Sequence, residues 1–376
     1  MSSAPVPSSA VSQPLRVEEC WGLDAFRAAR SDWDTLLQRL PGALPFQTPA
    51  WSLAWIGCFG VRRLLRQDEP LLLRVTQGQR LVALAPMVRT RYRLWPLGPA
   101  LVFDRTVGAD PNLTELRAPL IEPGCEAAVA QALLERTRRV WGWHKLELPA
   151  AALEAALAPL APARVHRHRL TPMFWLTLPD SWEAFRAGLK RNIKESLRRC
   201  YNSLAREGKT PRLEVVSGAT AIEGLLPLFW QLHSQRSQRP DTVPHPDYFA
   251  PPRHREFLRA LLQQAETDAT LQPLMFVLWV DQERVALRLG FRTPGSLYLY
   301  YSGYEHRWAP YSVMTTLVAE VLQWALGQGL HHVNLSVGRD VSKTRWSPQE
   351  QDFVEVLLTG GSGLKATLLR QATALA

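Results

Sequence analysis

Two apolar stretches, far apart in the chain, share one pattern of hydrophobic and polar positions. Residues 70–89 read PLLLRVTQGQRLVALAPMVR, and residues 273–292 read PLMFVLWVDQERVALRLGFR. In each stretch two apolar runs flank a short polar segment, 77–79 in the first and 281–283 in the second. Each also places Val-Ala-Leu twelve residues after its initial proline. Both patterns predict a β-hairpin.

The likeness continues beyond the hairpins. Each is followed by a run with apolar residues at helical spacing, 126–142 and 313–329, and then by a short apolar run typical of a strand. Gly142 in the first copy corresponds to Gly329 in the second, and the first copy is longer in its Pro/Gly-rich part around 95–124. The shared order of hairpin, helix, glycine and strand predicts a divergent internal repeat. We therefore expect an α/β (α+β) protein with two mixed-sheet units and flanking helices.

Helix signals precede the first hairpin. Residues 23–40 have an amphipathic helical pattern, and Thr48 followed by Pro49 is typical of a helix start. Trp51 and Trp55 lie one turn apart on one face of that helix, and we expect them in the core.

The segment between the two copies is also structured. It predicts a strand at about 172–178 and a helix or helix pair that begins at Asp180 or Ser181 and ends at Gly208. The predicted organisation is a disordered tail at 1–14, an N-terminal unit at 15–165, and a C-terminal unit at 166–376 with a helical insertion at about 180–262.

Composition narrows the class of protein. Hydrophobic residues make up 46% of the 376 residues, which is ordinary for a globular core. The net charge of +10 favours an anionic partner, such as a phosphorylated cofactor, nucleic acid, an acidic polymer or a membrane surface. Charge alone does not choose among these partners.

Several common chemistries lack their sequence signatures. There is no P-loop, no glycine-rich dinucleotide fingerprint and no nucleophile elbow, which argues against an ATPase, a Rossmann dehydrogenase and an α/β-hydrolase. The four cysteines have no metal-ligand spacing, so we expect reduced thiols and no metal. The first fourteen residues have neither a basic start nor an apolar core, and no run is apolar enough to span a membrane. We therefore expect a cytoplasmic protein.

The strongest candidate for a site is the stretch YYSGYEHRWAPYS, residues 300–312. A strand pattern precedes it, and a helix is predicted from Val313. The free amides and the dipole of a helix start favour an anion, and Arg307 adds a positive charge there. The basic helix over 186–212 places Lys190 and Lys194 on one side, where they could attract phosphate or an acidic substrate.

The same region carries a family resemblance. Residues 299–346 resemble the C-terminal signature of the cellulose-biosynthesis-associated acetyltransferases, which belong to the GNAT superfamily and are related to tandem-GNAT, FemABX-like proteins. A weaker similarity covers most of residues 45–346. The residues that match the family motif are Ser302, Gly303, Tyr304, Trp308, Ala309, Tyr311, Ser312, Gly338, Asp340, Lys343 and Trp346.

The resemblance implies a tandem GNAT fold and an acyl-CoA-dependent acyltransferase, with acetyl-CoA or another acyl-CoA as cosubstrate. The acyl group would pass to an amine or hydroxyl of a small-molecule, saccharide or peptide-like acceptor, as in polysaccharide biosynthesis. The implied roles are catalytic for Tyr301, Tyr304, Asp340 and His306; cofactor-binding for Arg307, Trp308, Tyr311, Ser312 and Asn334; and substrate-binding for Lys343, Trp346, Lys190 and Lys194.

The chain departs from the family pattern at several positions. Val313-Met314 stands where the family has Pro-Gly, and Asn334 stands where it has aspartate. Arg339 and Ser342 replace an aspartate and a tyrosine. Two alternatives therefore stay open: a catalytically weak GNAT-like binding or regulatory protein, and a FemABX-like transferase that uses aminoacyl-tRNA. Nucleic acid is otherwise not expected as a partner.

Overall fold

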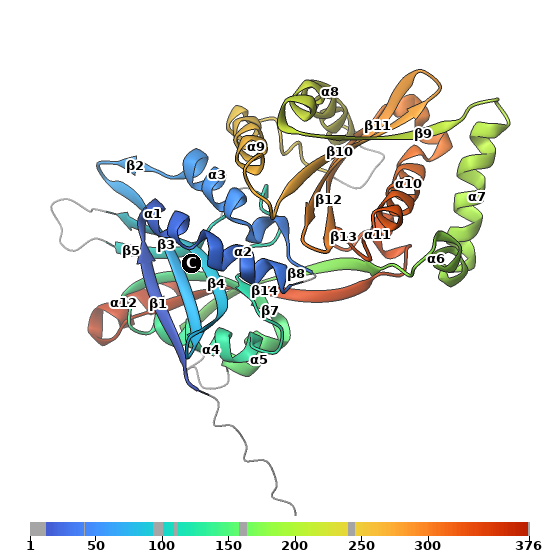
Figure 1. Ribbon diagram of the computed structural model, residues 1–376. Helices are drawn as coiled ribbons and strands as arrows, with labels where there is room; N and C mark the ends of the chain where they lie inside the picture. Colours follow the sequence, from blue (N-terminus) through green and yellow to red (C-terminus); the bar gives the residue numbers. More distant parts are fainter. Residues whose placement is uncertain are drawn as a thin grey trace, which may run out of the picture.

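The computed structural model describes residues 13–40, 42–92, 101–108, 112–157, 164–239 and 245–374. Its strands form one mixed sheet in the order β1-β3-β4-β5-β7-β14-β8-β13-β12-β11-β10-β9, with β2 paired to β3 and β6 paired to β4. Figure 1 shows two lobes, which we call the N half (13–157) and the C half (164–374). The prediction of an α/β fold with mixed sheets and flanking helices is confirmed.

The described residues of the N half form seven strands, and helices pack on both faces of them. The strands are β1 (Leu15–Trp21), β2 (Arg62–Arg63), β3 (Arg66–Gln77), β4 (Arg80–Tyr92), β5 (Leu101–Thr106), β6 (Leu120–Ile121) and β7 (Gly142–Pro149). The helices are α1 (Gly22–Ala28), α2 (Arg30–Gln38), the 3-10 helix η1 (Pro45–Gln47), α3 (Pro49–Phe59), α4 (Glu126–Thr137) and α5 (Ala150–Leu157).

The C half has the same kinds of element. Its strands are β8 (Val165–Thr177), β9 (Pro211–Ser217), β10 (Gln272–Val280), β11 (Glu283–Thr293), β12 (Ser296–Tyr304), β13 (His332–Val337) and β14 (Gln349–Gly360). Its helices are α6 (Trp182–Gly188), α7 (Arg191–Ala205), α8 (Ala219–Ser237), α9 (Pro252–Ala265), the 3-10 helix η3 (His306–Tyr311), α10 (Val313–Gly327), α11 (Val341–Thr344) and α12 (Gly363–Ala374).

The internal repeat is confirmed by topology. In the N half, β3, β4 and β5 pair antiparallel in sequence order, α4 follows, and β7 returns parallel to β5. In the C half, β10, β11 and β12 do the same, α10 follows, and β13 returns parallel to β12. Both predicted hairpins are present. The predicted helix at 23–40 is two helices, α1 and α2.

One long strand of the C half pairs with the N half. β8 pairs with β13 of the C half, whereas β14, which follows the C half's repeat, pairs with β7 of the N half. β8 and β14 also pair with each other, and Figure 1 shows them crossing from one lobe to the other. The pairing of β14 with both β7 and β8 joins the two halves into one continuous sheet.

The largest core also belongs to both halves. It packs α1, α2 and α3 of the N half against α8, α9 and the adjoining face of β10–β12. Trp51 and Trp55 are each 1% exposed, as predicted for core residues. The side chain of Thr48 accepts a hydrogen bond from the Trp51 amide and so caps α3. In the described ranges no helix is both long and apolar enough to cross a membrane.

Candidate active site

Two parallel strands of the C half separate part way along their length. β12 and β13 pair only where Ser296–Tyr298 faces His332–Asn334. Beyond these residues β12 continues to Tyr304 and β13 continues to Val337 without pairing to each other. We call the region between the diverging strands the strand split. Backbone groups that leave a ladder in this way become available to other partners.

A β-bulge accompanies the divergence in β12. Arg288 pairs with Ser302 and Gly290 pairs with Leu299, so that two residues of β12, Tyr300 and Tyr301, oppose one residue of β11. The Tyr300 hydroxyl donates to the Leu113 carbonyl, and the Tyr301 hydroxyl donates to the Asn112 carbonyl at 2.6 Å. The two tyrosines of the bulge therefore connect β12 to the N half by hydrogen bonds. Tyr301, a predicted catalytic residue, is 7% exposed.

A second bulge lies in β13. The register of β13 against β8 shifts between Asn334 and Val337, and Ser336 has a positive φ of 78°. Asn334 is buried; its Oδ1 accepts from the Ser336 amide, and its Nδ2 has no partner among the described residues. An unpartnered buried amide beside a strand split is a suitable donor or acceptor for a bound ligand.

A carboxylate from the N half bridges the two diverging strands. Glu115 accepts a hydrogen bond from the Tyr298 hydroxyl of β12 at 2.7 Å and from the Ser336 hydroxyl of β13 at 3.0 Å. Burial raises the pKa of Glu115, although the hydrogen bond from Tyr298 and the charges of Lys343 and Arg288 oppose this shift. The strand split of the C half thus contains a titratable group of the N half.

Two arginines meet beside the split at one hydroxyl. Arg236, near the end of α8, and Arg288 of β11 both reach the Ser302 hydroxyl of β12, at 3.3 and 3.5 Å. The Nε of Arg288 and the Nε2 of His245 are buried without a partner in the described structure. Burial, and then the charge of Arg236, lowers the pKa of His245 to about 3 and that of Arg288 to about 10.

A glycine allows α8 to lie this close to β12. A Cβ atom placed on Gly303 would come within 2.6 Å of the His233 amide nitrogen and the Leu232 carbonyl carbon, both backbone atoms of α8. His233 in turn approaches the Ser302 carbonyl with its Nδ1 at 3.2 Å. The glycine of the Ser-Gly-Tyr motif is therefore required by close packing.

Two of the predicted residues form a local pair near these arginines. Asp340 caps α11: its carboxylate accepts from the Ser342 amide and hydroxyl and from Lys343. Burial would raise the pKa of Asp340, but the hydrogen bonds from Lys343 and Ser342 lower it below its usual value. Burial lowers the pKa values of Arg236, Arg288 and His245, and the negative charge of Asp340 opposes this shift. Tyr304, at the end of β12, is partly buried, and it also opposes the lowering of the Arg236 pKa by burial.

The loop after β12 is a 3-10 helix, and most of its predicted residues contact other parts of the C half. His306 and Arg307 are exposed, and they contact Arg239 and Glu283 respectively. Trp308 is 6% exposed, and the Tyr311 hydroxyl donates to Glu207. These contacts give the loop a packing role in addition to any role in binding.

The start of α10 has a feature that the sequence did not reveal. Ser312, exposed and at a φ of 54°, precedes the first turn of the helix. Arg345, which follows α11, donates to the Thr315 hydroxyl in that turn at 3.2 Å and to the Ser196 hydroxyl of α7 at 2.6 Å. A cation without an ion pair in the described structure therefore lies beside the free amides of a helix start.

The remaining predicted residues lie on other parts of the C half. Lys190 and Lys194 are exposed, and Lys194 donates to the Ala187 carbonyl. Trp346 is 2% exposed and lines a separate cavity of about 260 Å³ between β8, α6 and the start of β14. The structure therefore gathers Tyr301, Tyr304, Asn334, Asp340 and Lys343 around the split, whereas Lys190 and Lys194 are exposed at the start of α7.

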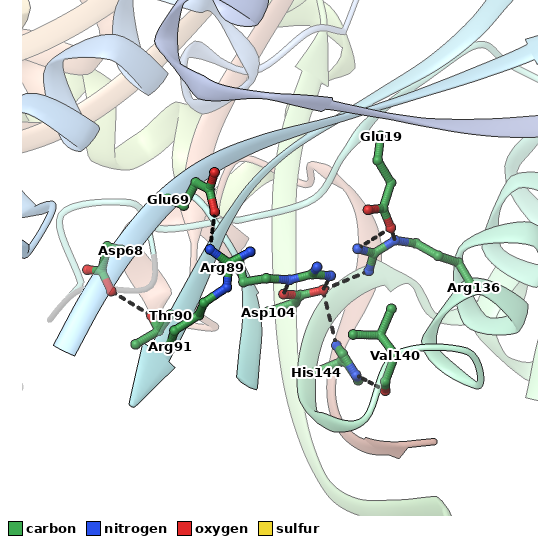
Figure 2. A network of polar contacts seen from close by, with 10 residues as sticks. All are labelled: Glu19, Asp68, Glu69, Arg89, Thr90, Arg91, Asp104, Arg136, Val140 and His144. Atoms are coloured by element: carbon green, nitrogen blue, oxygen red, sulfur yellow. Dashed lines mark hydrogen bonds and ion pairs between the residues drawn. The ribbon is translucent and has the colours of Figure 1, made fainter. Parts of the chain in front are cut away.

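At the corresponding strands of the N half the buried charges form ion pairs. β5 and β7 pair where Phe103–Arg105 faces Trp143–Lys145. Figure 2 shows Asp104 held there by Arg89, Arg136 and His144, with the Arg89 contacts at 2.6 and 2.7 Å. Burial opposes the ionised form of Asp104, yet these three partners lower its pKa far below the usual range. The positive and the negative groups of this buried network therefore all come from the N half.

Sequence reasoning missed the residues that the fold brings in from a distance. Glu115 lies in the Pro/Gly-rich segment of the first copy, and Arg236 is one of several polar residues near a helix end. Only the strict alternation along β11 could have indicated that Arg288 points to the opposite face from its apolar neighbours Leu287 and Leu289. In the described ranges no three His, Cys, Asp or Glu side chains are placed to hold a metal ion.

Comparisons with known proteins agree with this architecture. Residues 191–344 match the family model of the acetyltransferase (GNAT) domain. FemX superposes with a TM-score of 0.54 at 9% identity, covering 92% of this chain and 98% of FemX. A conserved protein of unknown function from Bacteroides thetaiotaomicron superposes with a TM-score of 0.50 at 12% identity, covering 88% of this chain and 97% of that protein.

At these identities the structural likenesses show the fold alone. No curated protein sequence matched the chain. The family model places a GNAT domain over the second copy of the repeat, and the FemX superposition extends the likeness over both halves. The chain has a GNAT acyltransferase fold in tandem form.

Proposed function

We propose that this chain is an acyl-CoA-dependent acyltransferase whose reaction takes place at the strand split of the C half. One observation carries the proposal: buried charges are paired at the corresponding strands of the N half, whereas several buried polar atoms at or beside the split of the C half have no partner in the part of the chain that the structure describes. These groups include Asn334 Nδ2, Arg288 Nε and His245 Nε2. Unpaired buried polar atoms cost free energy unless a ligand satisfies them. The GNAT domain match over 191–344 supports the acyl-CoA assignment.

The residues present fit a long, phosphate-bearing cosubstrate. Its extended arm would lie between β12 and β13, where strand edges and Asn334 offer hydrogen bonds. Its diphosphate would lie at the start of α10, near Ser312, where amides without helical partners and Arg345 supply the positive potential. Arg307 stays a second candidate for this role, but it is exposed and ion-paired with Glu283. The acyl-CoA would supply an activated thioester.

Transfer needs one group to take the proton of the attacking amine or hydroxyl and another to return a proton to the leaving thiolate. Asp340 is suited to hold the acceptor or to take its proton, because its lowered pKa keeps it ionised. Tyr304 is the better placed of the two tyrosines for donating a proton, since Tyr301 already donates to Asn112. Backbone amides freed by the bulges of β12 and β13 would stabilise the thioester oxyanion.

The acceptor proposed here is an amine or hydroxyl of a small-molecule, saccharide or peptide-like compound. Membership of the cellulose-biosynthesis-associated acetyltransferases, and hence a place in polysaccharide biosynthesis, is part of this proposal. The exposed cations of α7, among them Lys190, Arg191 and Lys194, favour one alternative, a transferase that binds the acceptor arm of an aminoacyl-tRNA. Binding of tRNA that weakens steeply with salt, together with no binding of acetyl-CoA, would favour that alternative.

The test compares two arginines by calorimetry with acetyl-CoA. Arg345→Ala should weaken binding by roughly tenfold or more, because a charge-assisted contact to phosphate is lost. Arg307→Ala, at an exposed pair, should change it by less than about threefold. Release of free thiol from acetyl-CoA, followed across amine and sugar acceptors, should accompany binding. No binding by the unaltered chain would refute the proposed function, and binding without thiol release would favour a regulatory protein.

A further inference from the structure

The meeting of Arg236 and Arg288 at Ser302 has no counterpart elsewhere in the described structure. The two side chains come from different elements, α8 and β11, and both contact the same hydroxyl. Neither forms an ion pair with any carboxylate in the described ranges, although each is largely removed from water. Two like charges held close together in a partly desolvated place repel each other and lose hydration.

The nearest carboxylates are already engaged. Asp340 accepts hydrogen bonds from Ser342 and Lys343, and Glu115 accepts them from Tyr298 and Ser336. These groups lessen the repulsion between the arginines but do not pair with either of them.

The other groups near this place include two histidines, Lys343 and Asp247, whose charge acts on His233. His233 and His245, whose rings lie 4.9 Å apart, have lowered pKa values and are uncharged at neutral pH. Lys343 lies close enough to lower the pKa of His245 further. Lys343 is paired with Asp340, so the two arginines are left without an ion pair in the described ranges, and each guanidinium fork can bind two oxygen atoms.

The N half shows how this fold satisfies a buried arginine when no ligand is needed. Arg89 of β4 faces Asp104 of β5 across the ladder and binds it through two hydrogen bonds. Arg288 of β11 faces Ser302 of β12 across the corresponding pair of strands. The positions are not equivalent in sequence, but the contrast is clear: in the N half the strand partner is a carboxylate, and in the C half it is a hydroxyl.

We propose that Arg236 and Arg288 bind an anionic group, a carboxylate or a phosphate, carried by the acceptor substrate. This inference rests on the proposed acyl transfer and extends it. Ser302 lies two residues before Tyr304 and next to the bulge of β12, so an anion bound there lies beside the strand split. The acceptor is then an amine or alcohol that carries a negative group near its nucleophile.

The experiment measures acyl transfer by the full chain with matched acceptors. Glycine is compared with glycinamide for the carboxylate, and glucosamine 6-phosphate with glucosamine for the phosphate. We expect at least one anionic acceptor to exceed its neutral partner by roughly ten- to a hundredfold in kcat/KM, the range expected for charge-assisted hydrogen bonds. The pair that shows the preference identifies the anion.

Two variants and a control locate the preference. Arg236→Gln and Arg288→Gln should each raise KM for the anionic acceptor, change kcat less, and bring the two acceptors of a pair closer together. Arg284→Gln is the control, because Arg284 is an exposed residue of the same strand that lies over Trp279. Equal use of both acceptors in each pair, or an unchanged preference in both variants, would overturn the inference.

A binding measurement separates this inference from the proposed function. Inorganic phosphate, compared with chloride at equal ionic strength, should raise the unfolding midpoint of the unaltered chain more than that of Arg288→Gln. Stabilisation by phosphate that depends on Arg288, without acyl transfer to any acceptor, would leave the anion site standing and contradict the proposed function. Acyl transfer without any anion preference would support the proposed function and contradict the anion site.

Discussion

At the scale of single residues, the two halves treat buried charge in opposite ways. In the N half Asp104 is surrounded by Arg89, Arg136 and His144, and its charge is fully compensated. In the C half Arg236 and Arg288 share a hydroxyl. A buried network that is completely paired stabilises a fold, whereas incomplete pairing is common where a ligand binds. This contrast supports the proposal that a ligand binds in the C half.

The uncharged state of His245 gives a pH prediction at this scale. An unfolded histidine takes up a proton near pH 6.5, but folded His245, facing Arg236, His233, Lys343 and Asp340, has a pKa of about 3. Between these values protons favour the unfolded chain, so stability falls as the pH is lowered from about 6.5.

Replacing His245 by glutamine removes this titration. Urea unfolding at pH 7.5 and pH 5.0 should therefore show a smaller loss of stability for His245→Gln than for the unaltered chain. His331→Gln is a suitable control, since His331 lies outside this cluster and contacts the Leu178 carbonyl. An equal loss in all three proteins would show that His245 is not held neutral by its surroundings.

At the scale of elements, the pattern of apolar positions predicts what depends on local sequence. The hairpins, strand 296–304 and helix 313–327 follow from periodicity and start signals, and the structure has them at these positions. The pairing of β14 with β7 of the N half was not predictable, because local sequence does not specify which distant strand it pairs with. The contact of Glu115 with β12 and β13 depends on that packing, and for this reason the sequence could not place it.

Gly303 gives a test of how closely α8 and β12 pack. Gly303→Ala places a methyl group against the backbone of His233 and Leu232, so the helix must move away from Ser302. We expect a loss of about 1–3 kcal/mol of unfolding free energy, together with a weaker preference for anionic acceptors.

The control for this variant is Gly57→Ala. Gly57 is an exposed position within α3, and its added Cβ would have no atom within 4 Å. Alanine there should stabilise the chain by about 0.5–1 kcal/mol. If Gly303→Ala were as stable as Gly57→Ala, the close approach of α8 to β12 would be contradicted.

At the scale of the whole molecule, the duplicated units are not two independent domains. They share the core between α1–α3 and α8–α9, and β14 of the C half pairs with β7 of the N half in one continuous sheet. The C half's strand split also depends on Asn112, Leu113 and Glu115 of the N half. The predicted tandem architecture is present, and the N half contributes to the candidate site by holding β12 in place and by bridging it to β13.

The central claim is that acyl-CoA binds at the strand split of the C half and not at the corresponding strands of the N half. Hydrogen exchange of backbone amides, measured on the full chain with and without acetyl-CoA, tests it most directly. We expect protection over 300–316 and 333–338, which contain the diverging strands and the start of α10, and none over 102–106 and 143–147. Protection of the N half's strands, or unchanged exchange at both places, would contradict the account.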